Sequence, residues 1–214
     1  MPPQARARRS RRGPRPAAIA VFCSGRGTNL QAILDATRTG RLHARVALVV
    51  SDRPEAPALA RARRAGADAR YVDPRRYPTR AAYERELIRL CESSGARLIC
   101  LAGFMRILSP VFVRRFRRRI LNIHPALLPA FPGAHAVRDA LAWGVKVTGV
   151  TVHVVDEDVD HGPIVLQEAV AVAPHDTEAS VRARLHRVEH RLYPRAIALM
   201  VSGRVRVEGR RVRR

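Results

Sequence analysis

The stretch AAIAVFCSGRGTNL, residues 17–30, decides the fold class. Its first seven residues, 17–23, form an apolar run that is typical of a strand buried on both faces. The two glycines of SGRGTN, residues 24–29, predict a tight turn, and an amphipathic segment begins at Leu30. A strand, a glycine-containing turn and a helix in this order predict the first unit of an α/β sheet.

Outward from this stretch, apolar runs alternate with amphipathic segments. The runs predict strands and the amphipathic segments predict helices. The predicted strands are 44–51, 97–103 and 119–124, and the predicted helices are 30–39, 57–65, 80–93 and 110–116. This alternation favours parallel βαβ units, so we expect a Rossmann-like α/β fold with a mostly parallel sheet flanked by helices.

The C-terminal part has a different pattern. Residues 147–155 and 163–172 both have strand character with no helical segment between them, so they are predicted to pair antiparallel. A long helix is predicted at 177–200 and a small hairpin at 204–212. The chain length is enough for one substantial core. We expect a disordered Arg/Pro-rich tail at 1–16, followed by a single domain at 17–214.

The chain has a formal net charge of +22, and about half of this excess lies at its ends. Residues 1–16 carry +6 and residues 204–214 carry +5, and subtracting both from +22 leaves +11 for residues 17–203. A basic body attracts anions, whether nucleic acid, a phosphorylated metabolite or a polycarboxylate. Charge alone therefore does not choose among these ligands.

The cysteines indicate a reducing compartment. Cys23, Cys91 and Cys100 show no CxxC spacing and favour neither a disulfide framework nor a zinc knuckle. A cytoplasmic location is the simplest interpretation. The apolar residues 17–23 are at the short limit for an export signal and lead into a glycine turn, which favours a strand there. No stretch approaches the roughly 18 apolar residues of a membrane span.

Residues 24–29 lie where backbone N–H groups and a helix dipole favour a phosphate group. A dinucleotide fingerprint requires a third glycine where Leu30 stands, although Asp52 has the spacing of the ribose-binding acid. The absence of a following Walker lysine argues against a nucleoside triphosphate. A monophosphate held by residues 27–29 is the remaining functional hypothesis, and an ordinary tight turn is the alternative.

A second polar group lies at the end of the predicted strand 119–124. Asn122 and His124 are two residues apart, so their side chains point to the same side of a strand. An amide can donate to a developing oxyanion, and an imidazole can exchange a proton near neutral pH. Asp160 is a candidate carboxylate that stabilises the imidazolium. These three residues predict acyl transfer without a covalent nucleophile.

The histidine and aspartate segments are also compatible with roles outside acyl transfer. His124 followed by Pro125 can form a structural turn, and the acidic loop around Asp160 can be a solvated surface or a cation site. Four histidines between 124 and 161 raise a metal hypothesis, but their spacing matches no standard ligand set. HRVEH, residues 186–190, has the HxxEH pattern of one metalloprotease class. Only one acidic residue follows it, which argues against zinc proteolysis.

In combination, these segments resemble the phosphoribosylglycinamide formyltransferases, the folate-dependent enzymes of purine biosynthesis. The similarity runs from Ile19 to about Val212. It rests on SGRGTNLQAI (24–33), AGFMRILSP (102–110), LNIHPALLPAFPG (121–133), VTGVTVHVVDEDVDHGPI (147–164) and VEHRLYP (188–194). HPxLLP and DxGP are shared by formyltransferases in general, whereas the phosphate loop points to this member. Ala126 and Ala134 depart from the family pattern, which affects the expected packing of their loop and not the chemistry.

The resemblance implies a role for several groups of residues. The catalytic residues it implies are Asn122, His124 and Asp160. The substrate phosphate is expected at Gly27, Thr28 and Asn29, and the glycinamide end at Glu189. The folate is expected along Met105, Arg106, Ile107 and Leu108, with contributions from Arg80 and Asn122.

The implied reaction transfers the formyl group of the co-substrate 10-formyltetrahydrofolate to the amine of phosphoribosylglycinamide, without a metal. Two related activities stay open, a formyltetrahydrofolate hydrolase, which typically carries an additional N-terminal regulatory domain, and a formyltransferase for a related phosphorylated amine. A nucleic-acid-binding protein is the alternative of another class, but few aromatic residues are present for stacking. We expect nucleic-acid binding to be weak at most and confined to the arginine-rich ends. No membrane partner is expected, and a monomer and a homodimer are both compatible with the sequence.

Overall fold

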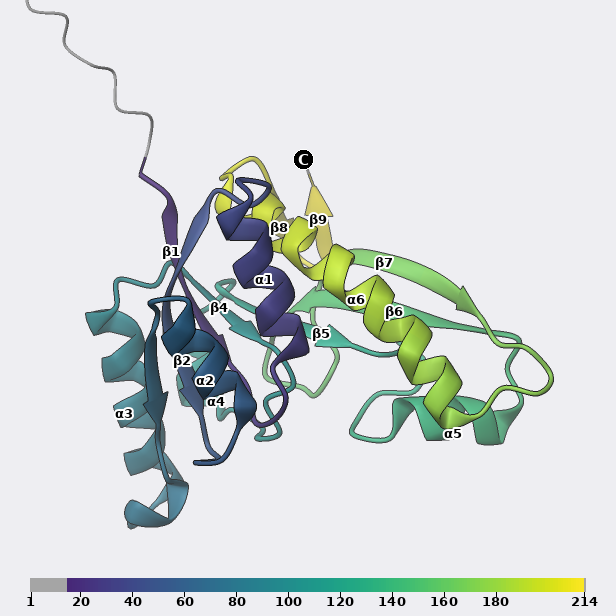
Figure 1. The fold of residues 1–214 in the computed structure, drawn as a ribbon, viewed down its shortest axis with the longest axis horizontal. Helices are drawn as coiled ribbons and strands as arrows, with labels where there is room; N and C mark the ends of the chain where they lie inside the picture. Colours follow the sequence, from purple (N-terminus) through teal and green to yellow (C-terminus); the bar gives the residue numbers. More distant parts are fainter. Residues whose placement is uncertain (1–14, 214) are drawn as a thin grey trace, which may run out of the picture.

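The computed structural model describes residues 15–213. Almost all of the segment predicted to be disordered, 1–16, lies outside the described residues. One nine-stranded sheet has the order β3-β2-β1-β4-β5-β6-β7-β9-β8, with helices packed against it (Figure 1). The predicted fold class, a Rossmann-like α/β sheet with an antiparallel pair near the C-terminal end, is confirmed.

Five strands form the parallel half of the sheet. In spatial order they are β3 (Asp68–Tyr71), β2 (Ala44–Ser51), β1 (Ala17–Phe22), β4 (Leu98–Leu101) and β5 (Ile120–His124). Ile19 and Val21 of β1 join one hydrophobic cluster, while Ala20 and Phe22 join another. Because side chains alternate along a strand, both faces of β1 are buried, which explains its continuous apolar sequence.

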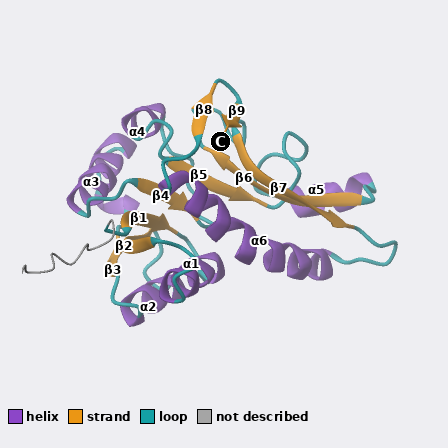
Figure 2. Cartoon of the chain, turned by 90° about the horizontal axis from the view of Figure 1, so that it is seen from above, coloured by secondary structure: helices purple, strands orange, loops and turns teal. Residues whose placement is uncertain are grey.

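Helices cover both faces of this half. They are α1 (Thr28–Arg38), α2 (Pro57–Arg64), α3 (Arg80–Ser93) and α4 (Pro110–Arg115). Figure 2 shows α1 and α2 on one side of the strands and α3 and α4 on the other. Ser109 begins α4 by accepting the N–H of Phe112 with its hydroxyl, and Thr79 accepts from Ala82 at the start of α3. Such caps satisfy N–H groups that have no partner within the helix.

The half of the sheet that follows β5 is mostly antiparallel, with a parallel pairing between β7 and β9. Its strands are β6 (Val147–Val154), β7 (Ile164–Ala171), β8 (Arg206–Glu208) and β9 (Arg211–Arg213). β6 pairs antiparallel with both β5 and β7, and β8 and β9 form the predicted C-terminal hairpin. α6 (Glu178–Val201) has 24 residues and begins with a capping box between Thr177 and Ser180. Among residues 15–213, no helix is both long and apolar enough to cross a membrane.

Three elements have no counterpart among the predictions. They are β3, the 3₁₀ turn Pro74–Arg76 and α5 (Ala136–Trp143). β3 is a polar edge strand whose residues alternate between exposed and partly buried, so no apolar run marks it. α5 begins after a proline-rich loop and has no side-chain cap at His135. The glycine C-cap at Gly144 is the local signal that marks the end of α5.

The carboxyl ends of β1, β4 and β5 meet at one edge of the sheet. The N–H of Ser24, just beyond β1, donates to the carbonyl of Gly103, just beyond β4, at 3.0 Å. Tyr193 of α6 is fully buried, and its hydroxyl lies 2.8 Å from the carbonyl of Leu101 and 3.1 Å from that of Leu121. These contacts hold α6 against the strands from which the polar loops emerge.

Candidate active site

The three side chains predicted to carry the chemistry meet beyond β5. Asn122 Nδ2 donates to Oδ1 of Asp160 at 3.1 Å, and Nδ1 of His124 lies 3.2 Å from Oδ2 of the same carboxylate. The side chains of His124 and Asp160 are 5% and 9% exposed. Asn122 and His124 share one side of β5, while Asp160 comes from the loop between β6 and β7. One carboxylate therefore holds both an amide donor and an imidazole.

The loop that carries Asp160 has a constrained backbone. Asp160 itself has a φ of 52°, in the left-handed region that few side chains favour. The N–H of Gly133 donates to Oδ2 of Asp160 at 2.8 Å. At Gly162, a Cβ atom would lie 1.8 Å from the carbonyl oxygen of Val154, so only glycine fits there. Backbone strain of this kind is maintained by surrounding contacts and is common at active sites.

Both ring nitrogens of His124 face acceptors. Nε2 lies 2.8 Å from the carbonyl oxygen of Phe131, and Nδ1 faces Asp160. Burial lowers the pKa of His124 below its ordinary value, although Asp160 and the Phe131 carbonyl act in the opposite sense. Burial alone raises the pKa of Asp160, but hydrogen bonds from His153 and the Gly133 amide and the charge of His124 hold it below its ordinary value. The site therefore keeps Asp160 ionised beside an imidazole that can change its protonation state.

His153 is a fourth member of the cluster that sequence reasoning missed. His153 is the cross-strand partner of Asn122 in the pairing of β5 with β6, and the residue is 1% exposed. Its Nε2 lies 3.2 Å from Asn122 Nδ2 and 3.5 Å from Oδ1 of Asp160. In the sequence, His153 stood out only as one of several histidines in a metal hypothesis. The useful signal is the cross-strand register, which places it opposite Asn122 and which the sequence alone does not reveal.

The glycine loop ends at the start of α1. Gly27 is the N-cap, with a φ of 69°, and Thr28 and Asn29 form the first turn, whose N–H groups lack intrahelical partners. A Cβ atom on Gly27 would lie 2.7 Å from Cβ of Ala58 in α2. Both the backbone angle and this close approach require glycine. The arrangement has the chemistry of an anion site, with donors and the positive end of a helix dipole.

The predicted phosphate and amine residues are in contact. Asn29 Nδ2 donates to Oε2 of Glu189 at 2.9 Å. Glu189 is 6% exposed, and Asn29 Oδ1 is buried and has no hydrogen-bond partner among residues 15–213. An unsatisfied acceptor beside a buried carboxylate suits a ligand that carries N–H or O–H donors.

The predicted folate residues surround the loop between β4 and α4. Met105 and Ile107 are 67% and 66% exposed, whereas Leu108 is buried. The guanidinium of Arg106 lies over the Tyr83 ring, 5.4 Å from its centroid. Arg80 donates to the carbonyl of Ile107 at 2.6 Å and pairs with Glu84 at 3.0 Å. Arg80 is thus next to this loop, and two exposed apolar side chains offer a surface to a flat ring.

Comparison with known proteins identifies the family. The model of the family described as formyl transferase matches residues 17–197. The chain belongs to the formyl transferase family. Over 189 residues it is 42% identical to phosphoribosylglycinamide formyltransferase of Escherichia coli (strain K12), an alignment that covers 88% of this chain and 89% of that protein.

Other known proteins are similar in sequence and structure. The chain is 47% identical to the trifunctional purine biosynthetic protein adenosine-3 of Drosophila melanogaster over 86% of its own length, but it spans only 14% of that relative. Glycinamide ribonucleotide transformylase 1 from Symbiobacterium toebii has a TM-score of 0.92 and 53% identity, with 94% of this chain and 95% of that chain covered. The high TM-score over nearly the whole length supports the common fold.

The HRVEH segment, residues 186–190, is not part of a metal-binding group. Within residues 15–213, no group of three or more His, Cys, Asp or Glu side chains is placed to hold a metal ion. The rings of His186 and His190 stack with centroids 6.2 Å apart, while Glu189 contacts Asn29. Glu189 therefore faces the glycine loop.

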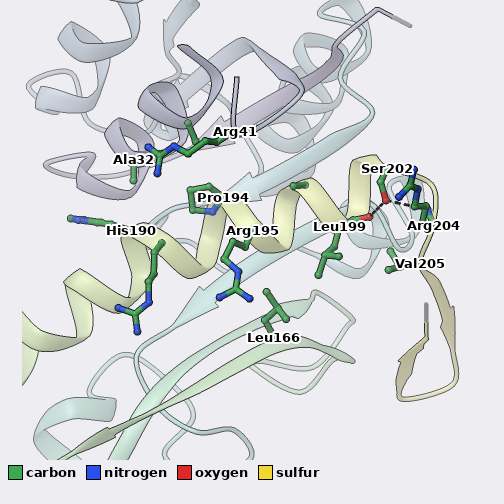
Figure 3. A pocket seen from close by; sticks show the side chains of 13 residues that line it. Ala32, Arg41, Leu166, His190, Pro194, Arg195, Leu199, Ser202, Arg204 and Val205 are labelled. Carbon is green, nitrogen blue, oxygen red and sulfur yellow. Dashed lines mark hydrogen bonds between the residues drawn. The ribbon is translucent and has the colours of Figure 1, made fainter. Parts of the chain in front are cut away.

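A hollow of about 780 Å³ lies away from the predicted site residues. Figure 3 shows Arg41 on one side of α6 and Leu166 on the other, with Arg195 on the helix between them. None of the predicted site residues lines this hollow. A second hollow of about 350 Å³ reaches Thr28. The candidate active site is consequently defined by its side-chain chemistry and not by the size of a cavity.

Proposed function

We propose that the chain transfers the formyl group of 10-formyltetrahydrofolate to the primary amine of phosphoribosylglycinamide in purine biosynthesis. The observation that carries this proposal is the Asp160 carboxylate, which contacts Asn122 and His124 at once. The glycine loop and Glu189, in contact with each other, support the choice of a phosphorylated amine as acceptor. The family membership and the similarity to the Escherichia coli enzyme, which covers 89% of that protein, support it independently.

In the proposed reaction, the acceptor nitrogen forms a bond to the formyl carbon, and the carbonyl becomes a tetrahedral oxyanion. Asn122 and protonated His124 donate hydrogen bonds to this oxyanion, and Asp160 stabilises the imidazolium. When the oxyanion collapses, the bond from carbon to N10 breaks. The acceptor nitrogen loses one proton and N10 gains one, so tetrahydrofolate leaves neutral at that nitrogen.

His153 and Phe131 determine which donors reach the formyl oxygen. Nε2 of His153 lies 3.2 Å from Asn122 Nδ2 and 3.5 Å from Oδ1 of Asp160, and these contacts orient the Asn122 amide. The Nε2 atom of His124 exchanges the Phe131 carbonyl for the formyl oxygen when the co-substrate binds. The two donors then point at a single atom, which is the geometry that oxyanion stabilisation requires.

The binding roles follow from the loops around this centre. The ribosyl phosphate binds the first turn of α1 through Gly27, Thr28 and Asn29, and Glu189 faces the amine. The folate lies along Met105, Arg106, Ile107 and Leu108, with Arg80 and Asn122 beside it. The exposed apolar side chains of Met105 and Ile107 support the placement of the folate ring.

A single assay tests the proposed function. Purified protein is mixed with 10-formyltetrahydrofolate, with and without phosphoribosylglycinamide, and the release of tetrahydrofolate is followed. We expect release that depends on the acceptor. Release without the acceptor would instead support a formyltetrahydrofolate hydrolase, and activity with a different phosphorylated amine would support another acceptor.

Three further features of the protein are proposals of the same kind. Residues 17–214 form a single domain, supported by the continuous nine-stranded sheet. A cytoplasmic location is supported by Cys23, Cys91 and Cys100, which are free and buried.

Any nucleic-acid binding resides in residues 1–16 and 204–214, and trimming both segments abolishes it without loss of formyl transfer. Salt-sensitive DNA binding by the trimmed protein would contradict this.

A further inference from the structure

Ser24 connects three loops at the carboxyl edge of the sheet. Its hydroxyl donates to Oδ1 of Asp52 at 2.6 Å and accepts the N–H of Met105 at 2.9 Å. Its own N–H donates to the carbonyl of Gly103 at 3.0 Å. Ser24 follows β1, Asp52 follows β2, and the other two residues follow β4. One serine thus joins the glycine loop to the loop predicted to bind the folate.

Asp52 sets the direction of these hydrogen bonds. A carboxylate only accepts, so the hydroxyl hydrogen of Ser24 points to Asp52 and a lone pair remains for the N–H of Met105. Asp52 is 7% exposed and forms no ion pair with any residue in the described range 15–213. Burial of a carboxylate without a cation costs folding free energy. The position of Asp52 is therefore set by its contact with Ser24 and not by charge pairing.

The loop 103–108 is held separately at its two ends. At the far end, α3 contacts the carbonyl of Ile107 through Arg80 and the N–H of Ser109 through Glu84. At the near end, Ser24 supplies the contacts to this loop described above. The glycine loop therefore contacts the near end of this loop, while the far end is bonded to α3.

We infer that Ser24 couples the binding of the two substrates, an inference that rests on the proposed function. A phosphate bound by residues 27–29 orders the loop that contains Ser24, and a folate bound along residues 105–108 orders the backbone of Met105. Each ligand stabilises the same hydrogen bonds. By thermodynamic linkage, each therefore raises the affinity of the protein for the other by the same factor. Ser24 and Asp52 are positioning residues in this scheme, because they act through Met105.

Calorimetry on the full chain measures the coupling with tetrahydrofolate and phosphoribosylglycinamide, which cannot react together because no formyl group is present. We expect saturating phosphoribosylglycinamide to lower the Kd of tetrahydrofolate about fivefold or more, a typical size for coupling between sites. In Ser24→Ala, the ratio of the tetrahydrofolate Kd values without and with phosphoribosylglycinamide falls to near one. Asp52→Ala also loses the coupling, whereas Asp52→Asn keeps most of it because the amide oxygen still accepts from the hydroxyl of Ser24.

Ser94→Ala is the matched control, because it removes a hydroxyl whose one hydrogen bond within the described residues is to the Cys91 carbonyl at the end of α3. In this variant, phosphoribosylglycinamide should lower the Kd of tetrahydrofolate by the same factor as in the wild type. Equal Kd values with and without phosphoribosylglycinamide in the wild type would overturn the inference, and so would full coupling in Ser24→Ala. If the wild type transfers formyl groups without coupling, only the inference fails. If it binds neither ligand, the proposed function fails. Ser24→Ala and Asp52→Asn provide the test even if Asp52→Ala does not fold.

Discussion

Asn29 and Glu189 are hydrogen-bonded at 2.9 Å although 160 positions separate them in the sequence. The contact joins the first turn of α1 to the middle of α6. The partner of the buried Glu189 carboxylate is a neutral amide, so its negative charge is not cancelled by this contact. The complementary ligand group is a positively charged nitrogen or an amine with several N–H donors.

Replacement of Glu189 by glutamine tests this relationship. The change keeps the size of the side chain and removes its charge. Hydrogen bonds to charged groups contribute about 1.5–3 kcal/mol, so we expect the KM for the acceptor to rise at least about tenfold. The KM for the folate should stay close to the wild-type value. Steady-state kinetics with each substrate varied in turn gives both constants. Glu178→Gln at the start of α6 is the control, and a similar effect there would argue against a specific role.

Asn122→Ala tests the oxyanion donor. Removal of one such donor typically costs about 3 kcal/mol of transition-state stabilisation, which corresponds to two to three decades in kcat. We expect a loss of that size, with much smaller changes in the affinity for the acceptor. Turnover of the purified variant is compared with the wild type at saturating substrates. Near-normal turnover would mean that Asn122 does not hold the developing charge.

The lowered pKa of His124 predicts a pH dependence of stability. An unfolded chain protonates this imidazole near its ordinary value of 6.5, whereas the folded protein protonates it only at lower pH. The unfolded state therefore binds more protons in this window, and the free energy of unfolding falls as the pH decreases below 6.5. Asp160 acts in the same direction at lower pH, because its folded pKa is also lowered, from 3.8.

Thermal unfolding of the wild type and His124→Gln checks this at pH 7.5 and pH 5. We expect the wild type to lose more stability between the two values than the variant does. His190, whose pKa burial also lowers, is present in both proteins and so does not affect the difference. The same dependence in both proteins would show that His124 is not the group responsible.

Gly27→Ala tests the glycine loop. The new Cβ would meet Ala58 at 2.7 Å, and the φ of 69° is unfavourable for alanine. We expect the loop to shift and the KM for phosphoribosylglycinamide to rise at least about tenfold, the loss of one charge-assisted hydrogen bond. Gly25→Ala is the matched control, because a Cβ there would meet no described residue within 4 Å other than its chain neighbours, and its φ is not in the left-handed region. Equal effects of the two changes would remove the argument for a specific role of Gly27.

Much of the fold follows from the sequence because the parallel strands are buried on both faces. The strand 44–51 and the helix 80–93 have the predicted bounds, since apolar runs and helical spacing mark them directly. β3 has no such mark, because its position at the sheet edge leaves its side chains half-exposed. Its pairing with β2 is a tertiary contact that no local pattern records.

Some residues of the candidate site can also be recognised from local sequence patterns, whereas others depend on tertiary contacts. Asn122 and His124 could be recognised as a pair because a strand's period of two relates them. His153 could not, since its contact with Asn122 depends on the register between β5 and β6. In the sequence, only its spacing from the glycine loop marks Asp52. Its hydrogen bond with Ser24 depends on two adjacent strands that end at the same edge of the sheet.

Glu189 and Tyr193 lie four residues apart on α6 and so face the same side of the helix. Through its hydrogen bonds to the main-chain carbonyls of two strands, Tyr193 fixes the rotation of α6 about its axis and the position of α6 along that axis relative to the sheet. An inserted or deleted residue between them would turn one of the two side chains away from its partners. During evolution, the acceptor preference proposed for Glu189 can therefore change by substitution, whereas an insertion or deletion in this turn would break the contacts of α6.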